Sequence, residues 1–563
     1  MFKTAPFFLF LILLCTGTHA QTTYLPLNTE GYHILDRLET KAATLEHGLY
    51  LNVRPVSRKS AVSFLVQQQL LDSGRLSEID RYNIEQNISI SGEWTEDENG
   101  AIDSKKPVLR HFYKKQSDLV YVKSKNFFLS ANPVISIQGD YVKSGVFKGR
   151  RLSSSRGFEV RGWLAKKIGF YSFFTDNQEQ APYYVGSWIE RYQAVPGGDY
   201  YKNEGNHYDY ILAKAYIDFA IIKDHLNLTF GYDKHFYGDG IRSLLLSDFA
   251  ANATFLRLNT RIWKFNYQNL FLELVPNYQR QFRPNGQGDI RYPHKYAAIH
   301  HLSMNVTRWL NIGLFESVVF GGRDRYEFSY MIPVIFYRAA ERQLGDPDNA
   351  NIGLNFKAIA AKKLQFYGQF LIDDFKAKEA FAGKGYWSNK FAMQLGMKYF
   401  DALNVSNLDL QGEFNVVRPY TYAHYDSTAN FSHYNQPMAH PLGSNFMEVI
   451  GQIKYQPMKD VFLSLKGIWY KQGIDTGNSN YGSNIFKDYY TATSMTGDPA
   501  DYQYYHRLLS GVGVSGLTLN LNASIELKRN IFMDLGVIRR TYEYKTLIVP
   551  KEETNFVYFG IRA

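Results

Sequence analysis

Cysteine is nearly absent from this 563-residue chain, whose single cysteine is Cys15. A disulfide needs two cysteines and thiolate metal sites usually need more, so both are excluded. Long apolar runs are also lacking, since none after residue 20 reaches the roughly 20 residues of a membrane-spanning helix. These absences exclude a disulfide-stapled scaffold and a helical membrane protein.

The first 20 residues have the pattern of a secretory signal peptide. Lys3 precedes an apolar run over 7–14, and the small residues Thr18 and Ala20 stand just before the expected cleavage site. We therefore predict a signal peptide over residues 1–20. Because Lys3 is its only charged residue, cleavage lowers the formal net charge from +10 to +9.

Aromatic residues are abundant, with 43 Tyr and 40 Phe, although the mean hydropathy is −0.32. An exported, aromatic-rich chain without membrane helices is typical of an outer-membrane β-barrel. The run 555–562 alternates apolar and polar residues and is rich in aromatics, as the last strand of such a barrel usually is. We predict the cell outer membrane as the location, with its lipid and the barrel-insertion machinery as partners.

The region 21–105 has a helical pattern. Ile34 and Leu38 recur at helical spacing, and similar groups follow. Ser57 and Ser77 are suitable helix N-caps. This region is predicted to be a small N-terminal periplasmic helical module followed by a linker.

The region 106–563 alternates with a period of two. In the clearest run, 517–527, apolar residues at every second position alternate with polar ones, as expected of a strand between two media. About 18 such runs occur, an even number as in single-chain bacterial barrels. The predicted fold is all-β, a transmembrane antiparallel β-barrel. Very short turns, expected on the periplasmic side, are predicted at Lys166-Lys167, Lys223-Asp224, Arg308-Trp309, Lys362-Lys363, Lys459-Asp460 and Arg529-Asn530.

The segment 231–261 interrupts the alternation. Strand-like runs lead in and out of it, and between them stands the apolar run 244–246, preceded by Gly238 and Gly240. A loop with its own apolar run is usually packed against something, so we predict that it folds back into the barrel.

A second segment, 321–327, has the charge density of an inward, salt-bridged loop and leads into an apolar stretch over 331–336. Together the two segments predict an occluded lumen. The residues predicted to line the lumen or the occluding loops are Asp233, Lys234, Arg242, Asp248, Arg257, Arg261, Arg323, Asp324, Arg325 and Glu327.

Three long segments, 178–207, 420–445 and 470–506, combine many aromatic rings with polar residues. Flat rings with a polar rim suit the faces of sugars. The alternative is the aromatic girdle that every such barrel places at the lipid headgroups. The candidate glycan contacts are Trp188, Tyr192, Tyr200, Tyr425, Tyr489 and Tyr504.

Signals for catalysis or cofactors are weak throughout the chain. No Gly-x-Ser-x-Gly elbow occurs, and Gly238-Asp239-Gly240 lacks the residues that a phosphate loop requires. His300 and His301 are neighbours, but adjacent strand residues point to opposite faces. We predict no enzyme activity, no cofactor, no metal site and no nucleic-acid partner.

Three blocks carry a family resemblance: GDGIRSLLLSDFA, FESVVFGGRDRYEFSYMIPVIFYRAAERQLGDPDNANIGLNF and YGQFLIDDF. They resemble the gliding-motility RemB proteins of Bacteroidota and, more distantly, the capsule-assembly Wzi family. The resemblance covers about residues 226–375. It implies an outer-membrane barrel with an N-terminal helical bundle that binds or organises capsular polysaccharide at the cell surface.

Two other functions stay open. One is an accessory role in gliding motility or surface-protein export, through a partner protein. The other is a passive porin, which would need an open lumen. The net charge of +9 after cleavage adds the expectation that a bound glycan is acidic.

Overall fold

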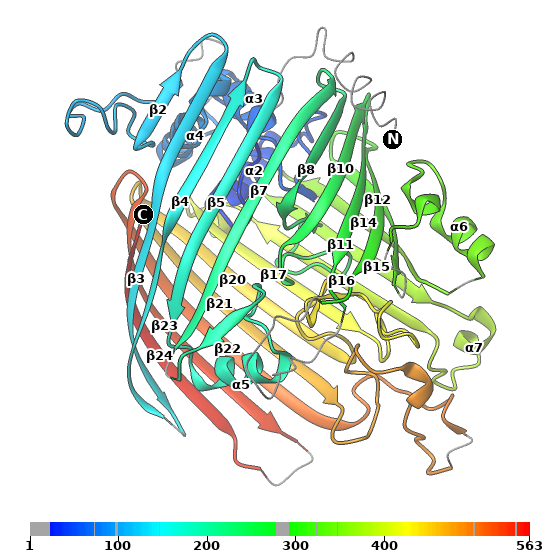
Figure 1. Cartoon of the computed structure of the whole chain (residues 1–563). Helices are drawn as coiled ribbons and strands as arrows, with labels where there is room; N and C mark the ends of the chain where they lie inside the picture. The colour runs from blue at the N-terminus through cyan, green and yellow to red at the C-terminus, as the bar shows by residue number, and fades with distance from the viewer. Residues whose placement is uncertain are drawn as a thin grey trace, which may run out of the picture.

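The computed structural model (Figure 1) describes residues 23–71, 74–95, 100–145, 147–205, 207–276, 292–321, 325–345, 347–498, 501–545 and 549–563. The predicted signal peptide over residues 1–20 lies outside the described residues. No helix in this described part is long and apolar enough to cross a membrane.

The N-terminal region forms three helices, α2 (Glu30–Ala42), α3 (Arg58–Leu70) and α4 (Glu78–Ile90), followed by the turn η1 (Gly92–Trp94). The predicted caps are confirmed: Ser57 accepts from the amide of Ser60, and Ser77 forms a capping box with Asp80. The helices share a small apolar core that includes Leu35, Leu38 and Phe64. We call residues 23–95 the helical module.

The rest of the chain forms a closed antiparallel barrel of 18 strands, which confirms the predicted fold. Pairing of the last strand with the first long one seals the wall. Around the wall the strands are β3 (Phe127–Ser144), β4 (Lys148–Leu164), β5 (Ile168–Glu179), β7 (Tyr208–Ile222), β8 (Leu226–Asp233), β10 (Ala253–Ile262), β11 (Phe265–Leu274), β12 (Lys295–Asn305), β13 (Leu310–Phe320), β14 (Asn349–Ala360), β15 (Leu364–Asp374), β16 (Lys390–Tyr399), β17 (Leu408–Val417), β20 (Phe446–Met458), β21 (Val461–Ile474), β22 (Val512–Lys528), β23 (Ile531–Tyr544) and β24 (Glu552–Arg562).

Short elements complete the chain. Two extra strands, β2 (Val120–Lys123) and β6 (Tyr201–Asn203), pair with β3 and β7 at the edge of the wall. The others are β1 (Val53–Arg54), β9 (Phe236–Tyr237), β18 (Ser432–His433), β19 (Gln436–Pro437), α5 (Tyr183–Tyr192), η2 (Phe328–Met331), α6 (Tyr337–Leu344), α7 (Ala377–Phe381), η3 (Ala402–Asn404) and η4 (Tyr489–Thr491).

All six predicted short turns are confirmed, and they lie at one end of the barrel. At several of them non-glycine residues adopt positive φ, for example Lys166 at 53° and Asp224 at 61°. Positive φ is typical of tight hairpin turns. We call this the turn end and the opposite one the loop end.

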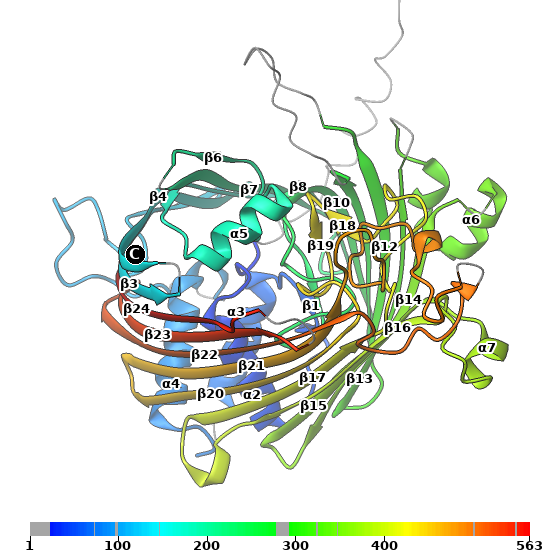
Figure 2. The same cartoon turned by 90° about the horizontal axis from the view of Figure 1, so that it is seen from below.

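The barrel wall has an apolar outer face. Along β22, Leu517, Leu519 and Leu521 point outward and are exposed, while the polar residues between them face the lumen. Seen from the loop end, the helical module and the short strands β1, β18 and β19 lie within the ring of strands, whereas α6 and α7 lie outside it (Figure 2).

Candidate functional site

The segment between β8 and β10 folds into the barrel, as predicted. Leu244 and Leu245 are fully buried, and they pack among inward-facing side chains such as Leu270 and Phe315. The amide of Tyr237 donates to the carbonyl of Leu246 over 2.9 Å, which closes the segment on itself. We call residues 234–252 the lumen loop.

Side chains of the wall hold the lumen loop in place. Gln369 Oε1 accepts from the amide of Leu244 over 2.7 Å, and Glu413 Oε2 accepts from the amide of Ile241 over 2.6 Å. At Gly238 the φ is +131°, and a Cβ would lie 2.1 Å from Gln369 Nε2. Glycine is therefore required where the lumen loop approaches the wall.

A second loop, residues 418–445, also fills the lumen, which the sequence had not indicated. Tyr422, Phe431 and Met438 are buried in the same apolar cluster as the lumen loop. The amide of Ser247 donates to the carbonyl of Met438 over 2.8 Å. We call this segment the second lumen loop.

The helical module enters the barrel at the turn end and reaches the lumen loop. Val53 of β1 pairs with Tyr237 of β9, and the amide of Gly238 donates to the carbonyl of Asn52 over 2.8 Å. The lumen is therefore occupied by three elements, and the lumen loop contacts both of the others.

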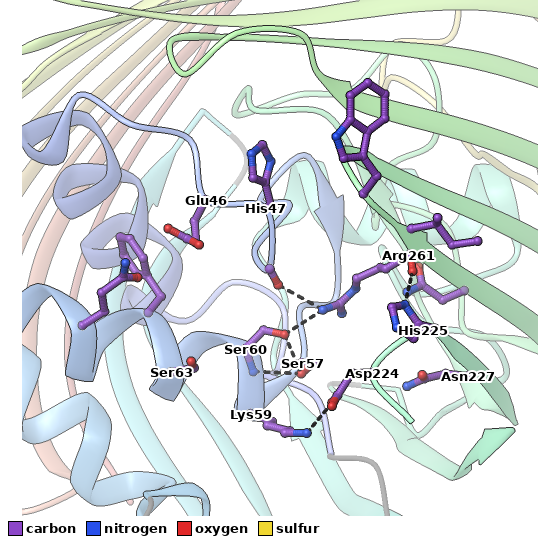
Figure 3. Close-up of a pocket in the computed structure, with 16 residues that line it drawn as sticks. Glu46, His47, Ser57, Lys59, Ser60, Ser63, Asp224, His225, Asn227 and Arg261 are labelled. Atoms are coloured by element: carbon purple, nitrogen blue, oxygen red, sulfur yellow. Dashed lines mark hydrogen bonds and ion pairs between the residues drawn. The ribbon is translucent and has the colours of Figure 1, made fainter. Parts of the chain in front are cut away.

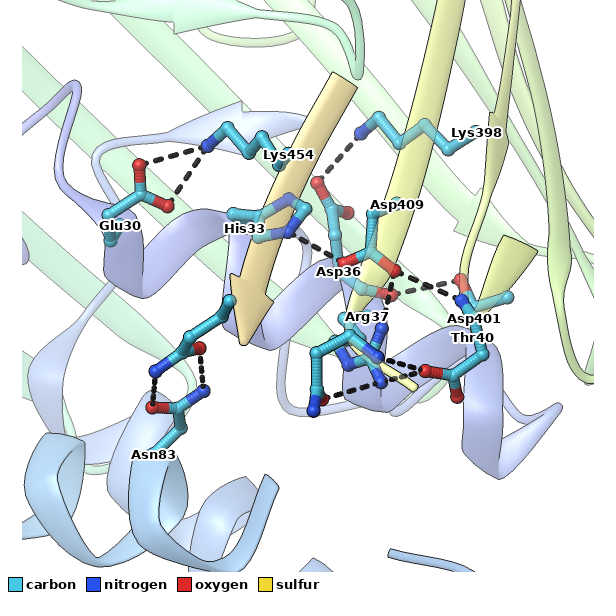
Figure 4. Close-up of polar contacts among 12 residues, drawn as sticks. Glu30, His33, Asp36, Arg37, Thr40, Asn83, Lys398, Asp401, Asp409 and Lys454 are labelled. Carbon is cyan, nitrogen blue, oxygen red and sulfur yellow. Dashed lines mark hydrogen bonds and ion pairs between the residues drawn. The ribbon is translucent and has the colours of Figure 1, made fainter. Parts of the chain in front are cut away.

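Charged side chains fix the module to the wall (Figure 4). Arg37 is buried beside the carboxylates of Asp401 and Asp409 on the wall. Its third partner is Asp80 of α4, 2.8 Å away. Lys398 Nζ lies 2.7 Å from Asp36. These contacts come from α2, α4 and the turn-end residues around β16 and β17.

Opposite charges decide how the acidic groups of the module ionise. Burial alone would raise the pKa of Asp80, but Arg37 and Lys41 outweigh it and lower that pKa to about 2. Burial likewise opposes ionisation of Asp36, and Lys398 and Lys357 lower its pKa to about 2.

A cleft of about 380 Å³ lies at the turn end, between α3 and the ends of β8 and β10 (Figure 3). Arg261 spans it, donating to Ser60 Oγ over 2.9 Å and to the carbonyl of Gly48 over 3.0 Å. Lys59 pairs with Asp224 over 2.5 Å. The cleft is the part of the interface between the helical module and the wall that side chains do not fill.

The predicted lumen residues lie in different places. Arg257 is buried in the lumen beside Tyr24 of the module, 4.2 Å from the ring centre. Lys234 Nζ donates to the carbonyls of Gly197 and Asp248 over 2.6 and 3.0 Å. Asp233 lies 3.5 Å from Lys214, Arg242 lies 3.5 Å from Glu448, and Asp248 accepts from Asn28 of the module over 2.6 Å.

One prediction about the lumen was wrong. The segment 325–345, which holds Arg325, Glu327 and the apolar stretch 331–336, lies on the outer wall and not in the lumen. Tyr326 packs against Phe320 on the outward face of β13. An apolar stretch next to charges looks the same in sequence whether it faces a lumen or lipid. Arg323 and Asp324 lie outside the described residues.

Several predicted glycan contacts gather in one aromatic cluster at the loop end. Tyr489 is buried and stacks on Trp387 with ring centres 4.5 Å apart. Tyr425 and Tyr490 lie over them, 41% and 56% exposed, with ring centres 6.1 Å apart. The cluster also includes Tyr386, Tyr420, Tyr502 and Tyr504. We call it the loop-end aromatic cluster.

Charges around this cluster are mixed. Lys390 Nζ lies 4.8 Å from the Tyr489 ring centre and pairs with Asp373 over 2.7 Å. Lys376 Nζ lies 5.0 Å from the Tyr386 ring centre. The cluster thus offers exposed ring faces beside both cations and carboxylates.

The predicted pair Trp188 and Tyr192 lies apart from this cluster, on α5. Their ring centres are 4.6 Å apart, and Trp188 also contacts Phe249 of the lumen loop, with ring centres 6.1 Å apart. Tyr192 reaches Phe486 at 6.3 Å, so α5 is packed against two loops. Tyr200 is half exposed between α5 and β6.

Sequence reasoning missed Trp387 and Tyr490 as candidates. Tyr490 directly follows the candidate Tyr489, and the Tyr386-Trp387 pair lies between β15 and β16, outside the three aromatic segments singled out in the sequence. A Tyr-Trp pair between two strands was the available signal. Among the described residues, no group of three or more His, Cys, Asp or Glu is placed to hold a metal ion.

Comparison with known proteins identifies the family. The model of the capsule assembly protein Wzi family matches residues 153–526. The chain belongs to the capsule assembly protein Wzi family. This confirms the more distant of the two predicted resemblances and agrees with an outer-membrane barrel that is not an enzyme.

One solved structure supports the fold, and two others are reported as more distant matches. Wzi of Escherichia coli, an outer membrane protein, is 11% identical, with 97% of this chain and 99% of that chain covered and a TM-score of 0.55. OprD of Pseudomonas aeruginosa is 10% identical, with 77% and 95% covered and a TM-score of 0.41. OccAB4 of Acinetobacter baumannii is 9% identical, with 77% and 98% covered and a TM-score of 0.39. Curated protein sequences gave no significant match.

Proposed function

We propose that this Wzi-family barrel binds surface polysaccharide at its loop end, through the loop-end aromatic cluster, and so takes part in capsule assembly. The observation that carries the proposal is the pair of exposed rings, Tyr425 and Tyr490, supported from below by the stacked rings of Trp387 and Tyr489. Rigid, exposed ring faces with polar neighbours suit the apolar faces of sugars.

Two further observations support this function over the alternatives. The similar Escherichia coli Wzi is a carbohydrate-binding β-barrel involved in group 1 capsule assembly. The occupied lumen disfavours a passive porin. An accessory role in gliding motility or surface-protein export, suggested by the likeness to RemB proteins, would need a protein partner and is the second candidate.

The decisive test compares glycan retention with barrel abundance on the same cells. Replacing Tyr425 and Tyr490 by Ala should lower glycan retention several-fold and leave the amount of inserted barrel unchanged, because neither ring lies in the wall. The matched control is Phe147→Ala, an exposed ring between β3 and β4 that lies outside both the cluster and α5. Normal glycan retention in the double variant would refute the site.

The pair on α5 forms a second arm of the same experiment. Trp188→Ala with Tyr192→Ala should also lower retention if α5 shares in binding. A girdle role predicts the opposite, less inserted barrel with normal retention per molecule. The expectation of an acidic glycan rests on the net charge and not on the mixed charges of the cluster. It therefore has its own test: binding should weaken as salt rises.

A further inference from the structure

A strap of chain lies on the outer wall of the barrel. Residues 325–345, between β13 and β14, include η2 and α6, and both figures of the whole chain place α6 outside the ring (Figures 1 and 2). Tyr330, Tyr337 and Ala340 of this segment are fully buried against outward-facing side chains of the wall, including Phe271 and Val318. We call residues 325–345 the strap.

Beneath the strap, the wall carries a row of polar side chains. Asn269 pairs with His300 across β11 and β12, and His300 pairs with Glu316 across β12 and β13. Their sequence neighbours Leu270 and Ile299 belong to the lumen cluster, so the row faces outward. We call these three residues the outer polar row.

The outer polar row lies at membrane depth. The strands β11, β12 and β13 have 10, 11 and 11 residues. A tilted strand of that length just crosses a bilayer. The row stands near the middle of all three strands, where a charged side chain facing lipid is unfavourable.

The strap covers the outer polar row and contacts each of its three side chains. The Tyr337 ring stacks on His300 with centres 4.0 Å apart. The carbonyl of Pro333 accepts from Asn269 Nδ2 over 3.0 Å, and the amide of Arg338 donates to Glu316 Oε1 over 3.4 Å. Asn269 and His300 are consequently buried although they point away from the lumen.

On its other face, the strap exposes apolar side chains along residues 328–336. Phe328, Val334 and Phe336 are 79%, 82% and 78% exposed. Next to the strap, Leu314 and Ile352 of the wall are also exposed and point outward. The apolar face of the strap therefore continues the lipid-facing surface of the barrel.

We propose that the strap is embedded in the outer membrane, with its apolar face against lipid acyl chains, and that it shields the outer polar row from lipid. The partner is the hydrocarbon of the membrane, because the exposed side chains of residues 328–336 are all apolar and lie beside the transmembrane strands. The exposed polar side chains of the strap, Arg325, Arg338, Arg342 and Gln343, lie outside that stretch. This inference does not depend on glycan binding.

The first test measures what surrounds the strap. The mature chain lacks cysteine once residues 1–20 are removed, so Val334→Cys and Phe336→Cys can each carry a single nitroxide in reconstituted bilayers. Both should be accessible to oxygen and protected from a water-soluble nickel reagent, as Leu354→Cys on the outer wall should be. Tyr505→Cys in a loop-end segment is the aqueous control. Nickel accessibility like that control would overturn the proposal, and so would low accessibility to both reagents, which would indicate a covering protein.

The second test asks what the strap protects. Deleting residues 326–344 should lower the folded, heat-modifiable fraction of the barrel several-fold, because the outer polar row then meets lipid. Combining the deletion with Asn269→Leu, His300→Leu and Glu316→Leu should restore most of that fraction. A deletion that is harmless in the otherwise unchanged chain, or that the three leucines do not rescue, would refute the shielding role.

Discussion

The hydroxyl of Tyr422 donates a hydrogen bond of 2.7 Å to the carbonyl oxygen of Leu244. Both residues are fully buried, and the contact joins the two lumen loops across 178 positions of sequence. The apolar run of the lumen loop is therefore held by a segment that the sequence pattern assigned only to the aromatic loops.

Tyr422→Phe tests this contact directly. The change leaves the Leu244 carbonyl buried without that donor, which should lower the free energy of unfolding by about 1–3 kcal/mol. The midpoint of heat modification in detergent measures the loss. Tyr505→Phe, at an exposed position, is the control and should leave the midpoint unchanged.

Conductance in planar bilayers should be low for the intact chain, because the helical module and both lumen loops fill the barrel. Deleting residues 238–248 alone should open it little, since Phe431 and Met438 of the second lumen loop stay in place. Deleting residues 238–248 together with 424–440 should give larger steps in the single-channel conductance. Large, steady channels in the intact protein would instead support the porin alternative.

Arg37→Met should loosen the helical module. Among the described residues, Arg37 is the only cation that contacts all three carboxylates, Asp80, Asp401 and Asp409. Its loss leaves these buried charges without that partner, which should lower the free energy of unfolding by about 3–5 kcal/mol. Faster proteolysis or hydrogen exchange in α2 would report it. Lys59→Met is the matched control, because its ion pair with Asp224 is largely exposed and worth about 0–1 kcal/mol. Equal effects of the two changes would contradict the docking role of Arg37.

Docking of the module should fail only in strong acid. The pKa values of Asp80 and Asp36 are about 2, below their ordinary value of 3.8. A carboxyl group whose pKa is lowered by folding contributes its full stabilisation at pH values above 3.8, the unfolded pKa. That stabilisation is lost as the pH falls through about 2, the folded pKa. Hydrogen-exchange protection of α2 should thus hold at pH near 4 and fall near pH 2. Asp80→Asn should flatten this dependence, and a loss of protection already between pH 5 and 6 would contradict the assignment.

The orientation of the barrel predicts which ends antibodies reach. Lys459 stands in a short turn and its Nζ lies 5.7 Å from the ring centre of Tyr82 in α4, so it shares the turn end with the module. A tag after Gly477, in an exposed loop-end segment, should be labelled on intact cells, and a tag at Lys459 should not. Equal labelling at both positions would overturn the orientation.

Most of the fold could be predicted from local sequence patterns. The alternation of 517–527, the short turns such as Lys223-Asp224 and the caps Ser57 and Ser77 depend on residues close in sequence, and all are confirmed. The inward packing of the lumen loop was also predicted correctly, although its apolar run Leu244 to Leu246 indicates burial and not on which side of the wall.

Contacts between distant segments were not predictable in this way. Nothing near Arg37 in sequence indicates that its partners are Asp401 and Asp409 on the wall. The stretch 331–336 was assigned to the lumen because its apolarity does not distinguish protein from lipid as the surroundings. Trp387 became a candidate only when folding stacked it on Tyr489.

The enclosure of the module has a consequence for the kinetics of assembly. Lys398 and Asp36, which bond over 2.7 Å, are 362 positions apart, and the wall is sealed only when β24 pairs with β3. Contacts between such distant positions form late, because a long stretch of chain must first be ordered. In a partly formed barrel the helical module therefore lacks its charged partners on the wall, and folding of this barrel should be slow.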